Sequence, residues 1–305
     1  MKIGMVGLGR MGGNMARRLR RGGIEVVAWN RSFEVTEALA RETGAQAAAS
    51  FEQLLAALPA PRVVWLMLPA GQATDEAIER LAALATPGDL IVDGANGYYR
   101  DAIRHAKALA ARGLEFIDCG VSGGIWGLGN GYCLMFGGEP EAAARVIPYM
   151  RVLAPTPDTG WLHCGPVGAG HFTKMIHNGI EYGMMQALAE GFALLEAKSE
   201  FGLNLAAIAE LWRHGSVVRS WLLDLTAQAL AEDQQLADIA PYVPDSGEGR
   251  WTALEAVEQG VPTPVMTMAL MMRFATQGRN DFPARLLAMM RKGFGGHAVK
   301  TGGEK

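Results

Sequence analysis

An acid and a base share one face of an expected helix in the middle of the chain. Residues 170–192 are mostly Phe, Met, Ile, Leu, Ala and Gly, which is typical of a helix buried on all sides. At about 100° per residue, the polar side chains of this segment fall on a single stripe. They are His171, Lys174, His177, Asn178, Glu181 and Tyr182. Burial moves the pKa values of Lys and Glu side chains towards neutrality, where both can transfer protons.

A glycine-rich motif lies near the amino terminus and has the spacing GxGxxG. It consists of Gly7, Leu8, Gly9, Arg10, Met11 and Gly12. The motif follows an expected strand (residues 3–6) and opens an expected helix (residues 11–21), which is the context that makes it specific for dinucleotides. Gly7 permits a tight turn, Gly9 lets the backbone approach a pyrophosphate, and Gly12 lets the helix pack on the strand. The alternative is an ordinary glycine-rich turn.

The choice between NAD and NADP is usually made at the end of the second strand, expected at residues 26–29. An NAD site carries Asp or Glu there, which accepts hydrogen bonds from the ribose. This chain has Asn30, Arg31 and Ser32 and no carboxylate. Arg31 can pair with a 2′-phosphate, and Asn30 and Ser32 can donate to it. The pattern favours NADP and leaves NAD possible; alternatively, Arg31 is a solvated loop residue.

Three further expected strands end in polar or flexible residues. Pro69 and Ala70 follow the strand expected to end at Leu68, Asn96 follows the next strand, and Ser122, Gly123 and Gly124 follow the last. In open α/β sheets, ligands bind outside the carboxyl ends of the strands. We therefore expect these residues to line one crevice, although each is equally compatible with a plain turn.

Two interpretations of the polar helix stripe stay open. It can form a substrate wall with one base and one acid, or it can hold a buried Lys174–Glu181 ion pair that fixes the helix orientation. The dinucleotide motif favours the first. No metal site is expected, because His171 and His177 are six residues apart and no third ligand is evident.

The order of expected elements predicts an α/β fold in two domains. Short apolar runs alternate with helical stretches in residues 1–165, which indicates βαβ units with a parallel sheet, a Rossmann-type dinucleotide-binding domain. Residues 166–305 show helical periodicity almost throughout, at 167–201, 205–214, 216–232, 252–259, 265–277 and 283–292. We expect an all-helical domain for substrate binding and oligomerisation, ending in a polar tail.

Composition excludes several classes of protein. Half of the 305 residues are apolar and the formal net charge is −3, so neither disorder nor nucleic-acid binding is expected. No run of 18 apolar residues and no signal peptide is evident. The three cysteines show no CxxC spacing, which indicates reduced thiols in a cytoplasmic protein.

Four segments resemble the decarboxylating 6-phosphogluconate dehydrogenase family. They are residues 121–124 (VSGG), 168–183 (with KMIHNGIEYG), 247–252 (GEGRWT) and 291–297 (RKGFGGH). The resemblance covers nearly the whole chain, in the short form of the family. There are two departures. Arg250 stands where the long form usually has Lys, and the acidic residue that several NAD-specific short forms carry after the second strand is absent.

The resemblance implies an oxidative decarboxylation with three catalytic residues. Lys174 takes the proton of the substrate 3-hydroxyl as hydride leaves C3 for the nicotinamide. Its ammonium then stabilises the enolate left by loss of CO₂, and Glu181 protonates C1 of the enediol to give ribulose 5-phosphate. Asn178 orders the nicotinamide edge, and no metal is required.

The same resemblance implies a complete substrate site for a phosphorylated sugar acid. Ser122, Gly123 and Gly124 hold the carboxylate, and Asn96, His177 and Asn178 bind hydroxyls. The phosphate ligands are Tyr182, Arg250, Thr252, Arg291 and His297, with Arg273 a further candidate of less exact alignment. Arg291 and His297 match positions that reach over from a neighbouring subunit, so the resemblance also implies a homo-oligomer, a dimer or a tetramer.

Two other functions remain to be distinguished. A non-decarboxylating 3-hydroxy acid dehydrogenase, of the 3-hydroxyisobutyrate or tartronate-semialdehyde type, would share the fold and the lysine but would need neither the acid nor the phosphate-binding cations. A non-catalytic NADP-binding sensor or scaffold could keep the glycines and lose the acid–base pair. Glu181, Arg250, Arg291 and His297 count against the first, and the joint presence of Lys174, Asn178 and Glu181 counts against the second.

Overall fold

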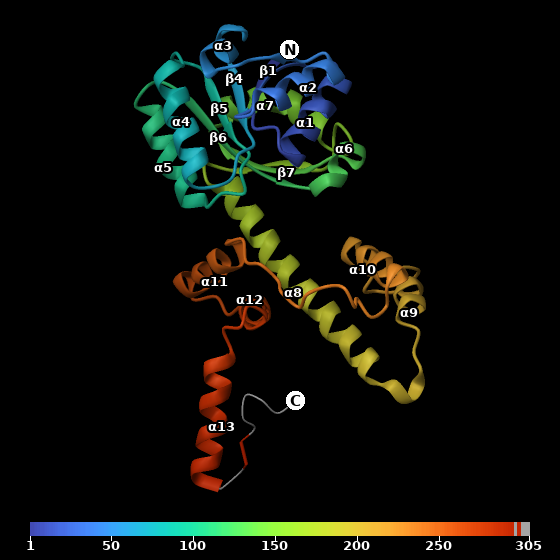
Figure 1. Cartoon of the computed structure of the whole chain (residues 1–305). Coiled ribbons are helices and arrows are strands. Elements are labelled where there is room, and N and C mark those ends of the chain that lie inside the picture. Colours follow the sequence, from blue (N-terminus) through green and yellow to red (C-terminus); the bar gives the residue numbers. More distant parts are fainter. Residues whose placement is uncertain (296–297, 300–305) are drawn as a thin grey trace. The chain divides into compact units, whose positions relative to one another are not determined.

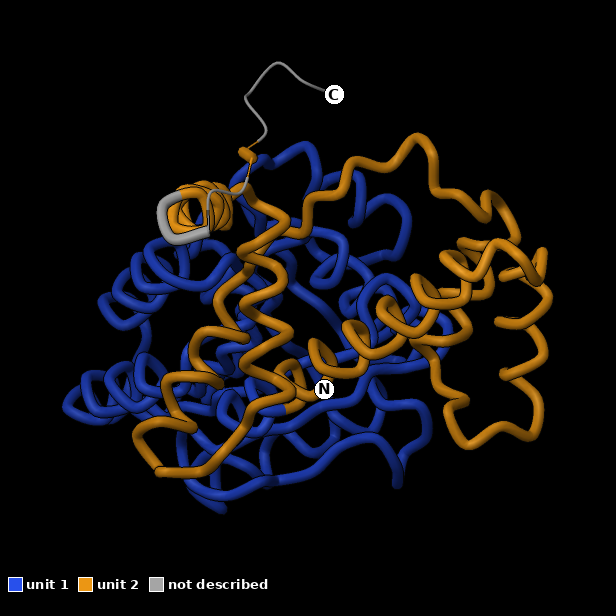
Figure 2. The backbone as a smooth tube through the Cα atoms, turned by 90° about the horizontal axis from the view of Figure 1, so that it is seen from below, with its two compact units in different colours: residues 1–176 blue, residues 177–305 orange. Residues whose placement is uncertain are grey.

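The computed structural model describes residues 1–295, 298 and 299. The chain divides into two compact units, residues 1–176 and 177–305 (Figure 2). The domain boundary expected after residue 165 stays a prediction.

An eight-stranded sheet forms the centre of the first unit (Figure 1). Its strands are β1 (Lys2–Val6), β2 (Glu25–Trp29), β3 (Gln46–Ala47), β4 (Val63–Leu66), β5 (Leu90–Asp93), β6 (Glu115–Ser122), β7 (Cys133–Gly138) and β8 (Trp161–Gly165). They lie in the order β3-β2-β1-β4-β5-β6-β7-β8. The reversal of strand order beside β1 is that of a Rossmann-type fold, which confirms the expected fold class.

One pair of strands departs from the expected parallel arrangement. β6 and β7 run antiparallel, with Cys119 opposite Phe136, whereas the other pairs in the sheet are parallel. A parallel connection needs a crossover of about a dozen residues or more. Only residues 123–132 join β6 to β7, with a 3-10 turn (Gly124–Trp126) and the one-turn helix α6 (Gly127–Asn130). The expected parallel arrangement therefore does not extend to this pair.

Helices cover both faces of the sheet, because its strands are apolar on both sides. The helices of this unit are α1 (Arg10–Arg21), α2 (Phe33–Thr43), α3 (Phe51–Ala56), α4 (Gln72–Leu84), α5 (Tyr99–Ala110) and α7 (Pro140–Leu153). Side chains alternate between the faces along each strand. Ile3 and Met5 share a buried cluster with α1 and α7, whereas Val6 belongs to the cluster under α3, α4 and α5.

The second unit is helical in the residues described. Helix α8 (Ala169–Ala197) runs into it and is followed by a 3-10 turn (Ser199–Phe201), α9 (Leu205–Trp212), α10 (Trp221–Glu232), α11 (Glu248–Gln259), α12 (Pro264–Thr276) and α13 (Asp281–Gly295). The segment expected to be helical from residue 216 begins its helix only at Trp221, because the Ser220 hydroxyl accepts from the Leu223 N–H and caps it there. None of the helices described is long and apolar enough to cross a membrane.

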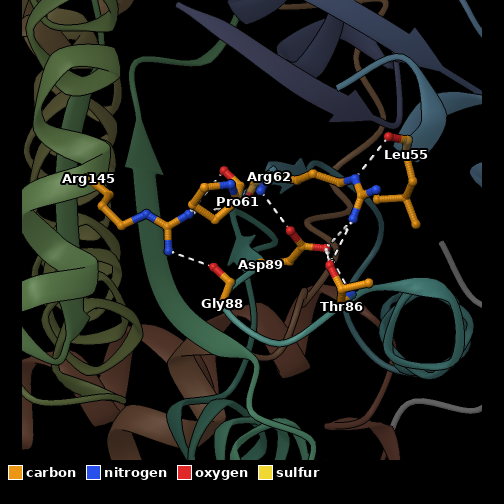
Figure 3. A network of polar contacts seen from close by, with 7 residues as sticks. All are labelled: Leu55, Pro61, Arg62, Thr86, Gly88, Asp89 and Arg145. Atoms are coloured by element: carbon orange, nitrogen blue, oxygen red, sulfur yellow. Dashed lines mark hydrogen bonds and ion pairs between the residues drawn. The ribbon is translucent and has the colours of Figure 1, made fainter. Parts of the chain in front are cut away.

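A polar network holds the amino ends of β4, β5 and β6 together (Figure 3). The Asp89 carboxylate accepts from the Arg62 backbone N–H at 2.7 Å and from its guanidinium at 2.8 Å. Arg145 of α7 donates to the Gly88 carbonyl at 2.9 Å and pairs with Glu115. Burial opposes ionisation of Asp89, but hydrogen bonds from Thr86 and Arg62 outweigh it and hold the pKa of Asp89 below its ordinary value.

Asp89→Asn is expected to lower the free energy of unfolding by about 2 kcal/mol, because a charge-assisted pair is lost inside the fold. A depressed carboxylate pKa gives stability that is present at neutral pH and lost as the pH falls through the folded-state pKa. The variant should therefore show a weaker acid dependence below about pH 4. Urea unfolding between pH 2.5 and 7 measures both effects.

Asp158→Asn is the matched control, because its carboxylate is 82 % exposed and 3.7 Å from Arg151. It should change stability by less than about 0.5 kcal/mol. Equal losses of unfolding free energy in the two variants would contradict a stabilising role for the Asp89 network.

Candidate active site

The glycine-rich loop between β1 and α1 forms a cradle with open space at its centre. A Cβ atom on Gly7 would lie 2.4 Å from the Met67 carbonyl oxygen, and one on Gly12 would lie 2.1 Å from the Gly7 carbonyl oxygen. A Cβ on Gly9 would meet nothing within 4 Å. Gly9 precedes α1, whose first turn has neither a side-chain cap nor an acidic residue. The free N–H groups and the open space fit a pyrophosphate.

Asn30 ties this loop to the end of β2. Its Oδ1 accepts from the Leu8 N–H at 3.1 Å, and its Nδ2 donates to the Ser32 carbonyl at 3.3 Å. The amide thus positions the loop, a role that the sequence did not indicate. Arg31 and Ser32 are exposed beside it, where a ligand can reach both.

The other residues expected at strand ends do lie at one edge of the sheet. β1, β4, β5 and β6 are adjacent and parallel, so their carboxyl ends point the same way. Leu68, Pro69 and Ala70 follow β4, and Asn96 follows β5. Ser122 ends β6, and Gly123 and Gly124 turn away from it with φ values of +130° and +52°. Pro69, Ala70 and Asn96 are exposed, whereas Leu68 and Ser122 are half-buried.

Lys174 is held against β6 by α8. It is 8 % exposed, and a Cβ on Gly120 would lie 2.3 Å from the Cβ of Lys174. Only glycine at position 120 lets the lysine stem pass so close to the strand. Gly120 and Ser122 are two residues apart, so they face the same side of the sheet.

Farther along α8, the stripe continues with interacting side chains. The His177 Nδ1 lies 3.0 Å from the Asn178 Oδ1 and 3.8 Å from the Glu181 carboxylate. The Glu181 side chain is 39 % exposed. The alternative of an ion pair between Lys174 and Glu181 stays a prediction.

In the second unit, Tyr182 is the centre of a polar cluster on α8, α11 and α12. It is 5 % exposed, and its hydroxyl has no hydrogen-bond partner among the described residues. The Arg273 guanidinium carbon lies 3.4 Å from the Tyr182 ring centroid. Thr252 is buried, and its Cγ2 would lie 2.7 Å from a Cβ on Gly179 of α8. A buried phenol beside an arginine is an arrangement that can bind an anion.

The remaining candidate cations are placed differently. Arg250 pairs with Asp245 and lies 4.5 Å from the Phe274 ring centroid. Arg291 is exposed on α13. His297 lies outside the described residues, so its expected reach into a neighbouring subunit stays a prediction. Of the cations, Arg273 makes the closest contact with Tyr182; the sequence had indicated it less clearly because its neighbours form no recognisable motif.

In the part of the chain that the structure describes, no three His, Cys, Asp or Glu side chains gather as a metal site would require.

Comparison with known proteins identifies the class and then the family. Residues 2–164 match the NAD binding domain of 6-phosphogluconate dehydrogenase, and residues 170–282 and 196–304 match the C-terminal domain of the same enzyme. Together with the glycine cradle and Lys174, this defines a two-domain NAD(P)-dependent dehydrogenase. The chain belongs to the 6-phosphogluconate dehydrogenase family.

Individual relatives support this assignment over the full chain. The NAD(+)-dependent decarboxylating 6-phosphogluconate dehydrogenase of Haloferax volcanii is 40% identical, covering 98% of each chain. The decarboxylating enzyme of Synechococcus elongatus is 38% identical over 88% of this chain and 60% of its own length. The solved Plasmodium falciparum 6-phosphogluconate dehydrogenase is 29% identical with a TM-score of 0.84, over 100% of this chain and 67% of its own.

A more distant likeness shows only the shared fold. The Mycobacterium tuberculosis 3-hydroxyisobutyrate dehydrogenase is 22% identical with a TM-score of 0.71, over 92% of this chain and 94% of its own.

Gly9→Ala is expected to leave the fold intact and to raise the dissociation constant for the dinucleotide at least about tenfold, since the added methyl fills the space for the pyrophosphate. Gly9 has φ −62°, which alanine adopts without strain. Fluorescence titration with NADPH and thermal unfolding test the two halves of this expectation.

Gly191→Ala is the matched control, because a Cβ there also meets nothing within 4 Å and position 191 lies inside helix α8. The control should bind NADPH like the wild type. Unchanged NADPH binding by Gly9→Ala would exclude the cradle as the cofactor site.

Proposed function

We propose that this protein oxidises 6-phosphogluconate at C3 and releases CO₂ and ribulose 5-phosphate, with NADP as its preferred cofactor. The observation that carries the proposal is the buried Lys174, seated on Gly120 two residues before Ser122. A buried amine can take a proton from a substrate hydroxyl, and backbone N–H groups at the neighbouring strand end can bind the carboxylate of the same substrate.

Three residues carry the chemistry in this proposal. The dinucleotide, when bound, accepts the hydride from C3. Lys174 takes the proton of the 3-hydroxyl. Loss of the hydride and of this proton together leaves a β-keto acid. When the bond to the carboxyl carbon breaks, its electron pair enters the C2–C3 bond, and the Lys174 ammonium stabilises the enolate oxygen. Glu181 then gives a proton to the former C2, and Asn178 orders the reacting groups.

The remaining polar residues bind the substrate. Ser122 and the N–H groups of Gly123 and Gly124 hold the carboxylate, while Asn96 and His177 bind hydroxyls. The phosphate is bound by Tyr182, Thr252, Arg250, Arg291 and His297, and Arg273 joins them. The unpartnered Tyr182 hydroxyl supports this assignment, because a buried donor without an acceptor is unfavourable until a ligand supplies one.

Absorbance at 340 nm tests the activity directly. The purified protein is mixed with 6-phosphogluconate and either NADP or NAD, with 3-hydroxyisobutyrate as the alternative substrate. Reduction of either cofactor in the presence of 6-phosphogluconate supports the proposal. Cofactor reduction with 3-hydroxyisobutyrate but not with 6-phosphogluconate would assign the chain to the non-decarboxylating dehydrogenases. Binding of NADPH without turnover of either substrate would favour the non-catalytic NADP-binding sensor or scaffold.

The preference for NADP follows from the end of β2. Arg31 is exposed there, and no carboxylate stands in its place to bind a ribose hydroxyl. The Haloferax volcanii relative is named as NAD(+)-dependent, so NAD is the competing cofactor in this proposal.

Arg31→Ala is expected to raise KM for NADP at least about tenfold and to change KM for NAD less than about threefold, because only NADP has a phosphate for the guanidinium to contact. Steady-state kinetics with both cofactors measure the ratio. Parallel losses for NADP and NAD would refute the role of Arg31.

Glu181→Gln is expected to slow the formation of ribulose 5-phosphate more than the reduction of cofactor, since protonation follows hydride transfer. Single-turnover absorbance at 340 nm, read beside quenched product analysis, separates the two steps. Glu190→Gln is the control, because Glu190 lies on the same helix, where its exposed carboxylate accepts a hydrogen bond from Gln186. Equal slowing of both steps in Glu181→Gln would contradict the assignment.

Self-association in the cytoplasm completes the proposal. Apolar side chains on α12 and α13 are widely exposed: Met268, Met271, Met272, Phe282, Leu286, Leu287, Met289 and Met290. Such a surface is typical of a subunit interface, and light scattering distinguishes a dimer or tetramer from a monomer. The three cysteines are unpaired thiols, in keeping with a reducing compartment.

A further inference from the structure

A carboxylate from inside the sheet caps helix α8. Asp118 of β6 is fully buried, and its two oxygens accept from the Gly168 and His171 N–H groups, each at 2.7 Å. The first N–H groups of a helix have no acceptor within the helix. The cap is usually the side chain just before the first turn, but that residue is Gly168. Asp118, 50 positions earlier, supplies the acceptors instead.

The helix also rests directly on the strand backbones, without side chains between them. A Cβ on Gly170 would lie 2.5 Å from the Asp118 carbonyl oxygen and 2.6 Å from that of Met135. A Cβ on Gly137 would lie 2.9 Å from the Gly170 nitrogen. Neither position accepts a larger residue without moving α8. The glycines therefore set the height of the helix above the sheet, and the carboxylate sets its rotation and its starting point.

Asp118, Gly120 and Ser122 lie on the same side of β6, because side chains alternate along a strand. The first holds the opening turn of α8, the second receives the stem of Lys174, and the third opens the loop assigned to the substrate carboxylate. One strand thus sets the spacing between the lysine and that loop.

The surroundings of the Asp118 carboxylate connect the first turn of α8 to a second strand, β5. Burial raises the pKa of Asp118, while His171 and the backbone N–H groups oppose that rise. The ring of His171 is 1 % exposed, and its Nε2 lies 3.2 Å from the Asp93 carbonyl oxygen. The opening turn of α8 is thereby joined to the end of β5, whose loop carries Asn96.

We propose that Asp118 is a positioning residue for Lys174: its two hydrogen bonds fix the register of α8 on β6, and this register places the lysine amine for proton transfer from the substrate. The inference rests on the proposed role of Lys174. If the cap only stabilised the helix, its removal would lower the stability of the protein, but the molecules that remain folded would keep the wild-type kcat.

Asp118→Asn tests the inference, since the amide keeps the shape and can accept from only one of the two N–H groups. Well below the unfolding temperature, kcat with 6-phosphogluconate should fall about 10- to 100-fold, as misplacement of a reacting group by about 1 Å can cause. The Kd for NADPH should stay within about twofold, and the acid limb of the kcat–pH profile should shift. Asp89→Asn is the control: it removes a buried carboxylate at the other end of the sheet and should keep the wild-type kcat and pH profile.

Gly120→Ala provides a second variant if Asp118→Asn does not fold. It keeps the cap and pushes directly on the stem of Lys174, so it should lower kcat with NADPH binding retained. Wild-type kcat and an unshifted pH profile in a folded Asp118→Asn, or in Gly120→Ala, would overturn the inference. Absence of activity in the wild-type protein would instead overturn the proposed function, so the two failures are distinguishable.

Discussion

Close contact between the backbone of α8 and the backbones of β6 and β7 is the constraint on which the candidate site depends. Helices usually pack on sheets through layers of side chains. Here glycines at positions 120, 137 and 170 remove those layers. Dispersion then acts directly between main chains, where little can shift by rotamer change. The Asp118 carboxylate adds hydrogen bonds from the N–H groups of Gly168 and His171. A lysine that emerges one turn later has a well-defined origin, although its own stem is flexible.

The amino and carboxyl ends of the strands differ in how their loops are held. Its amino ends are tied by the Arg62, Asp89 and Arg145 network, in which side chains bind backbone carbonyls of neighbouring loops (Figure 3). Its carboxyl ends carry glycine turns, with positive φ at Gly7, Gly123 and Gly124. The network at the amino ends keeps the strands in place, so the loops at the carboxyl ends can stay open to ligands. Parallel strands allow this because all their carboxyl ends meet at one edge of the sheet.

The sequence predicted what depends on local pattern. The GxGxxG motif needed only its neighbouring strand and helix to be assigned, and the polar stripe on residues 170–192 follows from helical periodicity alone. Contacts between distant residues left no such signal. Asp118 meets Gly168 across 50 positions, and Arg273 stacks on Tyr182 across two helices. The antiparallel β7 was missed for a related reason: strand direction depends on the length of a connection that contains its own short helix.

Charge balance around Tyr182 connects the proposed phosphate site with the proposed self-association. Arg250 and Arg273 bring two positive charges, but Asp245 pairs with Arg250, and the Glu248 carboxylate is buried in the first turn of α11. The four charges sum to about zero, whereas a phosphate monoester is close to a dianion at neutral pH. Further cations are therefore needed for tight binding. Arg291 and His297 are the residues to which the proposal gives this role, and a tail that supplies them from a second subunit would make the complete site a property of the oligomer.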